Sequence, residues 1–295
     1  MNFKKEQSKE TKVILKDFIA HYKNLASSLN KEPMAVKFLI MGLLNLNSSQ
    51  LYLKYEEEIK NININKIEES INLYLYKNTP IEHILGYTDF YGYKFIVNKD
   101  VLIPRRETEE LVLKILLMYD KYFKNKNIKV IDLGTGSGAI PITLKKEAPL
   151  INISGVDISK EALKIANKNK EHHKVDVSFY ESNWFMNVKG RYDFIISNPP
   201  YIKNNEEIDD LVKKEPKLAL YGGEKGIDHY ETILKDVNNH LTKNSIIFFE
   251  HGFDQSPLIK ELANKYLNNI KIKQYQDMQQ KDRITVIFKG DIFNE

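Results

Sequence analysis

Residues Val130 to Gly138 read VIDLGTGSG, an apolar run that passes directly into a turn with three glycines. We predict a buried strand, a tight turn and then a helix, because glycine lets the backbone turn sharply and approach a ligand closely. The spacing is Gly-x-Gly-x-Gly, which differs from the Gly-x-Gly-x-x-Gly of dinucleotide-binding proteins. A second apolar run, Ile151–Val156, ends at Asp157. This pairing of strand ends predicts a ligand site at one edge of a parallel sheet.

Asp157 is placed to accept hydrogen bonds from a ribose, as an acid at this point does in nucleotide-binding sheets. A glycine loop followed by such an acid occurs with nicotinamide cofactors and with S-adenosylmethionine. Asp132 precedes the glycines and suits a positively charged ligand better than a phosphate, which favours S-adenosylmethionine. The candidate cofactor residues of the loop are Asp132, Gly134, Thr135, Gly136, Ser137 and Gly138. A strand–helix turn without any ligand is the alternative.

Strands and helices alternate from Lys129 onward, which predicts an α/β fold whose mostly parallel sheet is covered by helices on both faces. The expected strands are Val130–Leu133, Ile151–Val156, Val175–Tyr180, Phe194–Ser197, Ile246–Glu250, Ile270–Tyr275 and Ile284–Lys289. The expected helices between them include Lys160–Asn169, Ile227–Leu241 and Pro257–Tyr266, and another helix ends near Tyr122.

From its start to about Gly86 the chain has only helical patterns, with apolar residues at helical spacing in Val13–Tyr22, Ala35–Leu46, Leu51–Ile59 and Ile67–Tyr76. Pro33 marks the start of one helix, with Asn30 as its expected cap. We predict a helical bundle over residues 1–86, a β-hairpin linker over 87–104 with Gly92 in its turn, and a ligand-binding domain over 105–295. Either the bundle docks a protein substrate or it only supports packing.

Asn198-Pro199-Pro200-Tyr201 follows the apolar run Asp193–Ser197. Two prolines fix the backbone and remove its N–H donors, so nearby carbonyl groups can point outward at a ligand. A plain turn at the end of a strand is the alternative, since Asn-Pro is a common turn initiator. Trp184 follows the third expected strand and is placed either against the adenine of a cofactor or in the core.

Taken together, the glycine loop, Asp157 and Asn198–Tyr201 resemble the S-adenosylmethionine-dependent amino methyltransferases. Further segments resemble the protein-glutamine methyltransferases of peptide chain release factors (the PrmC/HemK family): Leu102-Ile103-Pro104-Arg105, Thr108-Glu109, Glu215-Pro216, Ala219-Leu220, Gly222-Gly223 and Gly226. The resemblance implies a seven-stranded Rossmann-like class I methyltransferase domain, S-adenosylmethionine as methyl donor and release factors as protein partners. It implies methylation of the glutamine in their GGQ motif.

In this reading Asn198 and Pro199 offer two oxygen acceptors to the target amide, Pro200 stiffens the platform, and Tyr201 packs on the amide plane. Asn198 is also expected beside the cofactor. Glutamine methylation of a ribosomal protein stays an alternative, and so does methylation of an amino group in DNA or RNA. A non-catalytic cofactor-binding module is a third, although it would not need Asn198 and Tyr201.

Composition limits these choices. The 295 residues carry 44 Lys+Arg and 40 Asp+Glu, and residues 1–89 hold 12 Lys against 11 Asp+Glu. This near balance does not favour nucleic-acid binding, which relies on concentrated positive charge. The absence of cysteine excludes disulfides and thiolate metal sites, and no metal site is predicted. No stretch approaches the roughly 18 apolar residues of a membrane span, so we expect a cytoplasmic protein without membrane contact, and a monomer.

Overall fold

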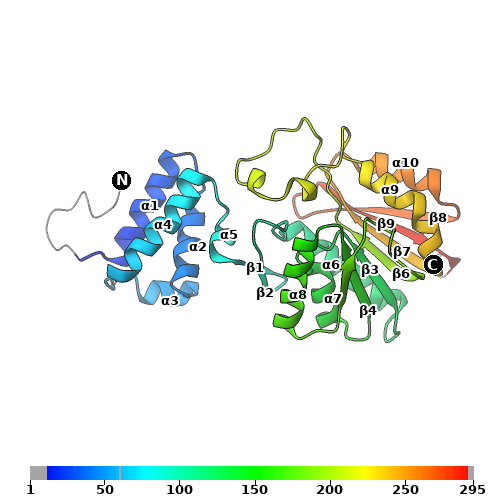
Figure 1. The fold of residues 1–295 in the computed structure, drawn as a ribbon, viewed down its shortest axis with the longest axis horizontal. Coiled ribbons are helices and arrows are strands. Elements are labelled where there is room, and N and C mark those ends of the chain that lie inside the picture. The colour runs from blue at the N-terminus through cyan, green and yellow to red at the C-terminus, as the bar shows by residue number, and fades with distance from the viewer. Residues whose placement is uncertain (1–11, 60, 292–295) are drawn as a thin grey trace. The chain divides into compact units, whose positions relative to one another are not determined.

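The computed structural model describes residues 12–59 and 61–291, which form two compact units (Figure 1). The first unit comprises residues 12–86 together with Asp209–Lys214, and the second comprises Tyr87–Ile208 with residues 215–291. The break at Gly86 lies where the sequence predicts the bundle to end. The segment Asp209–Lys214 joins the first unit although it lies far along the chain, and no local sequence pattern predicts that.

The first unit is a bundle of helices. These are α1 (Leu15–Ser28), α2 (Pro33–Leu43), α3 (Ser48–Leu53), α4 (Asn61–Lys77) and α5 (Ile81–Leu85). Apolar side chains at helical spacing, including Phe18, Leu39 and Ile71, are fully buried in its core, and Leu211 of the later segment packs against them. Burying apolar surface in this way is the main force that holds such short helices together.

Two local predictions in the bundle are wrong. Asn30 does not cap α2, because its backbone is left-handed; the cap is Glu32, whose carboxylate accepts a hydrogen bond from Met34 N. The helix expected over Leu51–Ile59 ends at Leu53. The chain that follows instead bonds to the chain around the start of α1: Lys16 N donates to Tyr55 O at 3.0 Å, and Ile59 N to Val13 O at 2.8 Å.

The second unit is built on a seven-stranded sheet in the order β5-β4-β3-β6-β7-β9-β8. Its strands are β3 (Lys129–Leu133), β4 (Asn152–Asp157), β5 (Ser178–Glu181), β6 (Tyr192–Ser197), β7 (Leu241–Glu250), β8 (Ile270–Gln276) and β9 (Asp282–Lys289). β3 to β7 are parallel, and β9 runs antiparallel between β7 and β8. The predicted α/β class is therefore confirmed. From β3 the strand order runs to β4 and β5 on one side and to β6 and β7 on the other. The carboxyl end of β3 is therefore the point at which the strand order reverses, and sheets of this kind bind ligands there.

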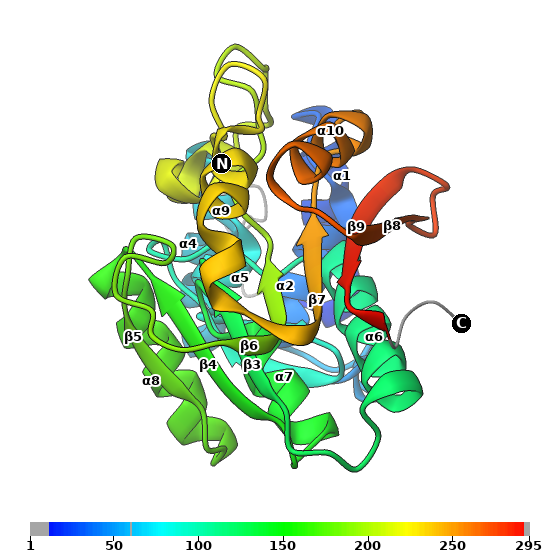
Figure 2. The same cartoon turned by 90° about the vertical axis from the view of Figure 1, so that its right-hand side faces the viewer.

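Helices cover both faces of the sheet, as the sequence predicts (Figure 2). One face packs on α6 (Arg106–Tyr122) and α7 (Ala139–Glu147), with α8 (Lys160–His173) beside α7. The other face packs on α9 (Asp228–Asp236) and α10 (Ser256–Tyr266). Short 3₁₀ turns occur at Val212–Lys214, Lys217–Ala219 and Val237–His240. Within residues 12–59 and 61–291, no helix has both the length and the apolar character needed to cross a membrane.

The β-hairpin predicted as a linker is formed by β1 (Tyr87–Phe90) and β2 (Tyr93–Ile96). Phe90 and Phe95 are fully buried in the core of the second unit, with their rings edge to face at 5.9 Å. Asn169 of α8 accepts a hydrogen bond from Ile96 N at 2.7 Å and donates one to Ile96 O at 3.0 Å. The hairpin is thus built into the domain that holds the glycine loop.

Candidate active site

The glycine loop joins the carboxyl end of β3 to the start of α7. The N–H groups of Gly134 and Thr135 both donate to Val156 O of β4, each at 2.8 Å, which anchors the loop to the neighbouring strand. Gly136 has φ +53°, and a Cβ placed on it would meet nothing within 4 Å. Gly134 and Gly136 line a cavity, so the loop presents bare backbone to it. Thr135, Ser137 and Gly138 are buried behind this surface.

Asp157 ends β4 and lines the same cavity. Its Oδ2 accepts a hydrogen bond from Gly136 N at 2.9 Å, and its Oδ1 accepts one from Ser159 N at 2.8 Å. Burial raises the pKa of Asp157, and these backbone N–H donors oppose the shift. A carboxylate has about four acceptor positions, so Asp157 keeps capacity for a ligand hydroxyl. It also ties the glycine loop to the start of α8, a structural role that the sequence did not predict.

Asp132 lies in β3 and is only 1% exposed. Burial raises its pKa to about 7, and the nearby charge of Asp157 adds to the shift. The Thr135 hydroxyl lies near enough to oppose part of it, but neither Asp132 oxygen nor Thr135 Oγ1 has a hydrogen-bond partner of ordinary geometry within the described residues. Asp132 does not line the cavity. It is a buried acid whose charged form a nearby cation would stabilise.

Trp184 forms an aromatic wall of the cavity together with His229. The two rings lie 5.2 Å apart, and a Cβ on Gly134 would contact the indole at 3.5 Å, so the indole covers the glycine loop. Trp184 has φ +47°, an uncommon backbone conformation for an aromatic residue. Ser182 holds this turn, because its Oγ donates to Trp184 O at 2.7 Å and accepts from Asn187 N at 3.0 Å. No local sequence pattern singles out His229.

Asn198 follows β6 directly, and it lines the cavity together with Pro200. Asn198 Nδ2 donates a hydrogen bond to Thr108 Oγ1 of α6 at 3.3 Å. Pro199 and Tyr201, in contrast, do not line the cavity. Pro199 is buried, and Tyr201 packs against the core beneath α9 and α10. Burial raises the pKa of Tyr201 to about 12, and the charge of Glu250 adds to this.

A glycine-rich segment that follows the motif packs directly on its backbone. A Cβ on Gly222 would lie 2.4 Å from Pro200 O, and one on Gly226 would lie 2.2 Å from Tyr201 O. Gln255 Nε2 donates to Tyr201 O at 2.7 Å and to Gly226 O at 3.2 Å. Glycine is required here for close backbone approach. Gln255 was missed in the sequence because it reaches the motif from the loop after β7.

The opposite side of the cavity is formed by two loops that Glu215 joins. Glu215 Oε2 accepts a hydrogen bond from Ile103 N at 2.8 Å, and its other oxygen pairs with Arg105. The Glu215 side chain is only 1% exposed, whereas that of Arg105 is 34% exposed. Arg105, which the sequence offers only as part of a segment of family resemblance, is therefore a partner of a buried acid. Arg106 is exposed at the start of α6.

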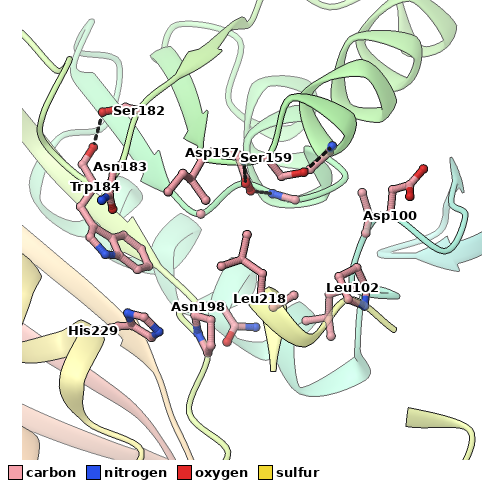
Figure 3. Close-up of a pocket in the computed structure, with 18 residues that line it drawn as sticks. Asp100, Leu102, Asp157, Ser159, Ser182, Asn183, Trp184, Asn198, Leu218 and His229 are labelled. Carbon is pink, nitrogen blue, oxygen red and sulfur yellow. Dashed lines mark hydrogen bonds between the residues drawn. The ribbon is translucent and has the colours of Figure 1, made fainter. Parts of the chain in front are cut away.

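These segments enclose a cavity of about 320 Å³ at the carboxyl ends of the strands (Figure 3). Figure 3 shows Trp184 and His229 on one side of it, with Asp100 and Leu102 on the opposite side. Predicted site residues Gly134, Gly136, Asp157, Trp184, Asn198 and Pro200 line it. The donor set fits S-adenosylmethionine: a carboxylate with spare acceptor capacity for a ribose, a flat indole for adenine, and a buried acid behind the glycine loop whose charged form the positive charge of the cofactor would stabilise.

Comparisons with known proteins give the family of the chain and its fold. Residues 114–219 match the family model described as Methyltransferase small domain. The chain is 34% identical over 263 residues to the release factor glutamine methyltransferase of Bacillus cereus, which covers 86% of this chain and 92% of that protein. It is 33% identical to the enzyme of the same name from Streptococcus pneumoniae, over 88% of this chain and 93% of that protein. A crystal structure of a methyltransferase from Pyrococcus furiosus has a similar fold, with a TM-score of 0.51, 18% identity and coverage of 68% of this chain and 91% of that chain.

The seven-stranded sheet and the glycine loop at its switch point define a class I methyltransferase that uses S-adenosylmethionine. With a third of its residues identical along nearly the whole of its relatives' length, the chain belongs to the family of release factor glutamine methyltransferases.

Proposed function

We propose that this chain methylates the side-chain amide nitrogen of a glutamine in peptide chain release factors, the glutamine of the GGQ motif by resemblance to its family. One observation carries the assignment to this cavity. Asn198 lies in the same cavity as the glycine loop, and its Nδ2 is occupied by Thr108, so its Oδ1 is left to accept a hydrogen bond from a substrate. An amide-bearing substrate needs an acceptor of this kind.

The cofactor half of the site is formed by the glycine loop, Asp157, Trp184 and Asp132. When bound, S-adenosylmethionine supplies a methyl group on a positively charged sulfur. In our proposal the backbone of residues 134–138 holds the cofactor, Asp157 accepts from its ribose, and Trp184 packs on its adenine. Asp132 balances its positive charge from behind the loop, since a cation favours an ionised neighbour.

The substrate half of the site acts on a poor nucleophile, because the lone pair of an amide nitrogen is delocalised into the carbonyl group. Asn198 Oδ1 accepts one N–H of the glutamine amide from within the cavity, and the Pro199 carbonyl accepts the other, although Pro199 does not line the cavity before the substrate binds. Two fixed acceptors orient the nitrogen and favour the positive charge that develops on it. Pro200 keeps this backbone stiff. Holding both reactants in contact can lower the barrier by roughly 7–11 kcal/mol.

Tyr201 has a less direct place than Asn198. Its ring packs against the core rather than lining the cavity, so contact with the amide plane requires its side chain to move when the substrate binds. No general base is needed before attack, because the amide proton becomes acidic only as the new bond forms. His229 therefore has a place in the aromatic wall and none in proton transfer.

The N-terminal bundle is proposed to dock the release factor, and the chain is proposed to act as a monomer in the cytoplasm without direct contact to nucleic acid. Support comes from the near balance of charge in residues 1–89 and from large apolar side chains exposed on the bundle, of which Tyr52 is 63% and Leu53 84% exposed. The absence of cysteine suits a reducing compartment.

The Asn198→Ala variant tests the role of the acceptor. We expect kcat for methylation of a purified release factor to fall by about 10²–10³-fold, the usual effect of removing one preorganised hydrogen bond to a reacting group. The dissociation constant for S-adenosylhomocysteine should stay within about twofold of wild type, because the glycine loop, Asp157 and Trp184 remain. Methylation near the wild-type rate would overturn the role assigned to Asn198.

A further inference from the structure

Glu250 is a buried acid that the mechanism above does not use. It ends β7, and the pairing of Phe249 with Ser197 puts it next to Asn198 across the neighbouring ends of β7 and β6. Glu250 is 1% exposed, and its Oε2 has no hydrogen-bond partner within the described residues. An acid in this position costs stability unless its surroundings use it, because burial of an unpaired charge is unfavourable.

Several polar and charged groups face the Glu250 carboxyl group from different elements. The Thr108 hydroxyl of α6 and the Asn198 amide lie against it and stabilise its charged form. Arg283 of β9 acts in the same direction, and Glu107 of α6 acts against it. The Tyr230 hydroxyl donates to the backbone carbonyl of Glu250 at 2.7 Å, and the charge of Glu250 raises the pKa of both Tyr201 and Tyr230. Glu250 thus lies directly behind the acceptor proposed to hold the substrate.

The Thr108 hydroxyl links the two side chains in a defined direction. A hydroxyl group has one proton to donate and can accept from other donors. Thr108 Oγ1 accepts from Asn198 Nδ2 at 3.3 Å, which leaves its own proton available for the Glu250 carboxylate, whose charged form Thr108 stabilises. In this arrangement the NH₂ group of Asn198 faces Thr108 and Glu250. A flipped amide would turn its oxygen toward a carboxylate and its NH₂ toward the substrate amide, and both contacts would be repulsive.

We propose that Glu250 is a positioning residue for methyl transfer, which keeps Asn198 Oδ1 directed at the substrate through Thr108 and through its own carboxylate. The inference rests on the function proposed above. Glu250 touches neither substrate nor cofactor, and it acts only through the orientation of Asn198.

The inference predicts a pH dependence with a defined sign. Only the ionised carboxylate is a pure acceptor. The protonated acid can itself donate to Thr108, which reverses the direction of the hydrogen bonds between Glu250, Thr108 and Asn198. Burial raises the pKa of Glu250 to about 7 despite the opposing effects of Thr108, Arg283 and Asn198. The side-chain amide of Asn198 is therefore held in its productive orientation above this pH and is free to flip below it. At saturating cofactor, kcat should rise with pH through about 7 and then level off.

The test compares wild type, Glu250→Gln and a matched acid-to-amide control, Asp193→Asn. Asp193 lies near the amino end of β6, where it accepts from Lys129 N and Thr242 Oγ1. The measurements are kcat and KM on a purified release factor from pH 5.5 to 9 at saturating S-adenosylmethionine, and the Kd for S-adenosylhomocysteine. For Glu250→Gln we expect kcat about tenfold lower above pH 8, no rise through pH 7, and unchanged cofactor binding. Asp193→Asn should keep the wild-type profile.

Thr108 provides a second pair of variants. Thr108→Val removes the hydroxyl at nearly constant volume, so it should lower kcat and abolish the rise through pH 7, whereas Thr108→Ser keeps the hydroxyl and should restore both. A Glu250→Gln enzyme with the wild-type kcat and pH profile would overturn the positioning role, and so would a Thr108→Val enzyme that keeps the rise. A wild-type chain that transfers no methyl group to the release factor would instead overturn the proposed function, and the inference with it.

Discussion

Asp132 shows at the scale of one residue how the fold prepares a site for a charged ligand. It is an acid in the middle of a parallel sheet, with neither oxygen paired within the part of the chain that the structure describes. Its pKa is about 7, against an ordinary value of 3.8, because burial in the folded protein makes the charged form of Asp132 less favourable than it is in water. A cation in the cavity would relieve that penalty, so the residue couples ligand binding to pH.

This coupling predicts how stability changes with pH in the absence of cofactor. Between the unfolded and folded pKa values the folded chain retains a proton that the unfolded chain has lost, so the free energy of unfolding falls as pH rises from about 4 to 7 and is level above that. A shift of about three units corresponds to at most about 4 kcal/mol. In urea unfolding at pH 5 to 8.5, Asp132→Asn should therefore gain stability relative to wild type up to about pH 7.

Glu250 does not disturb this comparison, because it is present in both proteins. Saturating S-adenosylhomocysteine should reduce the gain, since its ammonium group favours the ionised acid. A difference between Asp132→Asn and wild type that stays the same from pH 5 to 8.5 would contradict the shifted pKa.

The residues recovered from sequence lie at or shortly after the carboxyl ends of strands. Asp157 and Asn198 each follow an apolar run, and the parallel sheet then brings their strand ends together. His229 and Gln255 were missed, and the contact of Thr108 with Asn198 was not predicted, because these side chains reach the cavity or the motif from other elements, through contacts that no local pattern contains. Tyr201 was placed against the substrate from its motif alone, whereas the structure packs its ring into the core.

At the scale of elements, the segment from Gly222 to Gly226 is what holds the Asn-Pro-Pro-Tyr motif in place. Ile202 N donates to Leu220 O at 2.9 Å, and Gly222 N donates to Ile202 O at 2.8 Å, so the two loops run side by side. The sequence gives these glycines as a point of resemblance. The structure supplies the physical reason, which is the close approach of two backbones.

Gly222→Ala should therefore impair catalysis more than stability. The new Cβ would lie 2.4 Å from the Pro200 carbonyl, a backbone atom that can move only with the motif. Displacement of about 1 Å in a site can cost up to about 10²-fold in rate, so we expect a large fall in kcat with cofactor binding largely kept. Gly190→Ala is the control: its φ is +91° but a Cβ there meets nothing within 4 Å.

The two variants separate local displacement from general loss of stability. Gly190→Ala should unfold at lower denaturant concentration than wild type, because alanine is strained at positive φ, yet it should methylate normally. Equal effects of the two substitutions on kcat would argue against a role for the glycine segment in holding the motif.

At the scale of the whole molecule, the chain combines an α/β domain that contains the candidate active site with a helical bundle whose element bounds are harder to predict from sequence. The α/β domain follows from strand and helix alternation, and each of its seven strands overlaps a predicted apolar run. The helix expected over Ile227–Leu241 is too long, because α9 ends at Asp236 and β7 begins at Leu241. The bundle boundaries were less predictable. The acids Glu56, Glu57 and Glu58 were read as part of a helix, but the chain there bonds to the segment around α1.

A docking role for the bundle predicts an effect on KM without an effect on kcat. Replacing Tyr52 and Leu53 by serine removes two exposed apolar side chains, and we expect KM for an intact release factor to rise by about threefold to tenfold, the range of a modest interface contact. Leu113→Ser with Leu117→Ser is the matched control, because these side chains are 48% and 50% exposed on α6. The same rise in KM for both double variants would contradict docking by the bundle.

The central claim is that the methyl acceptor is a glutamine amide of a release factor, and labelled S-adenosylmethionine tests it directly. The purified chain would be incubated with the label and a mixture of release factor, ribosomal proteins and DNA, followed by mass spectrometry of the labelled product. We predict label on the release factor, on the side-chain nitrogen of the GGQ glutamine, and labelling about 10²–10³-fold slower with Asn198→Ala. Label confined to DNA or to a ribosomal protein would contradict the account.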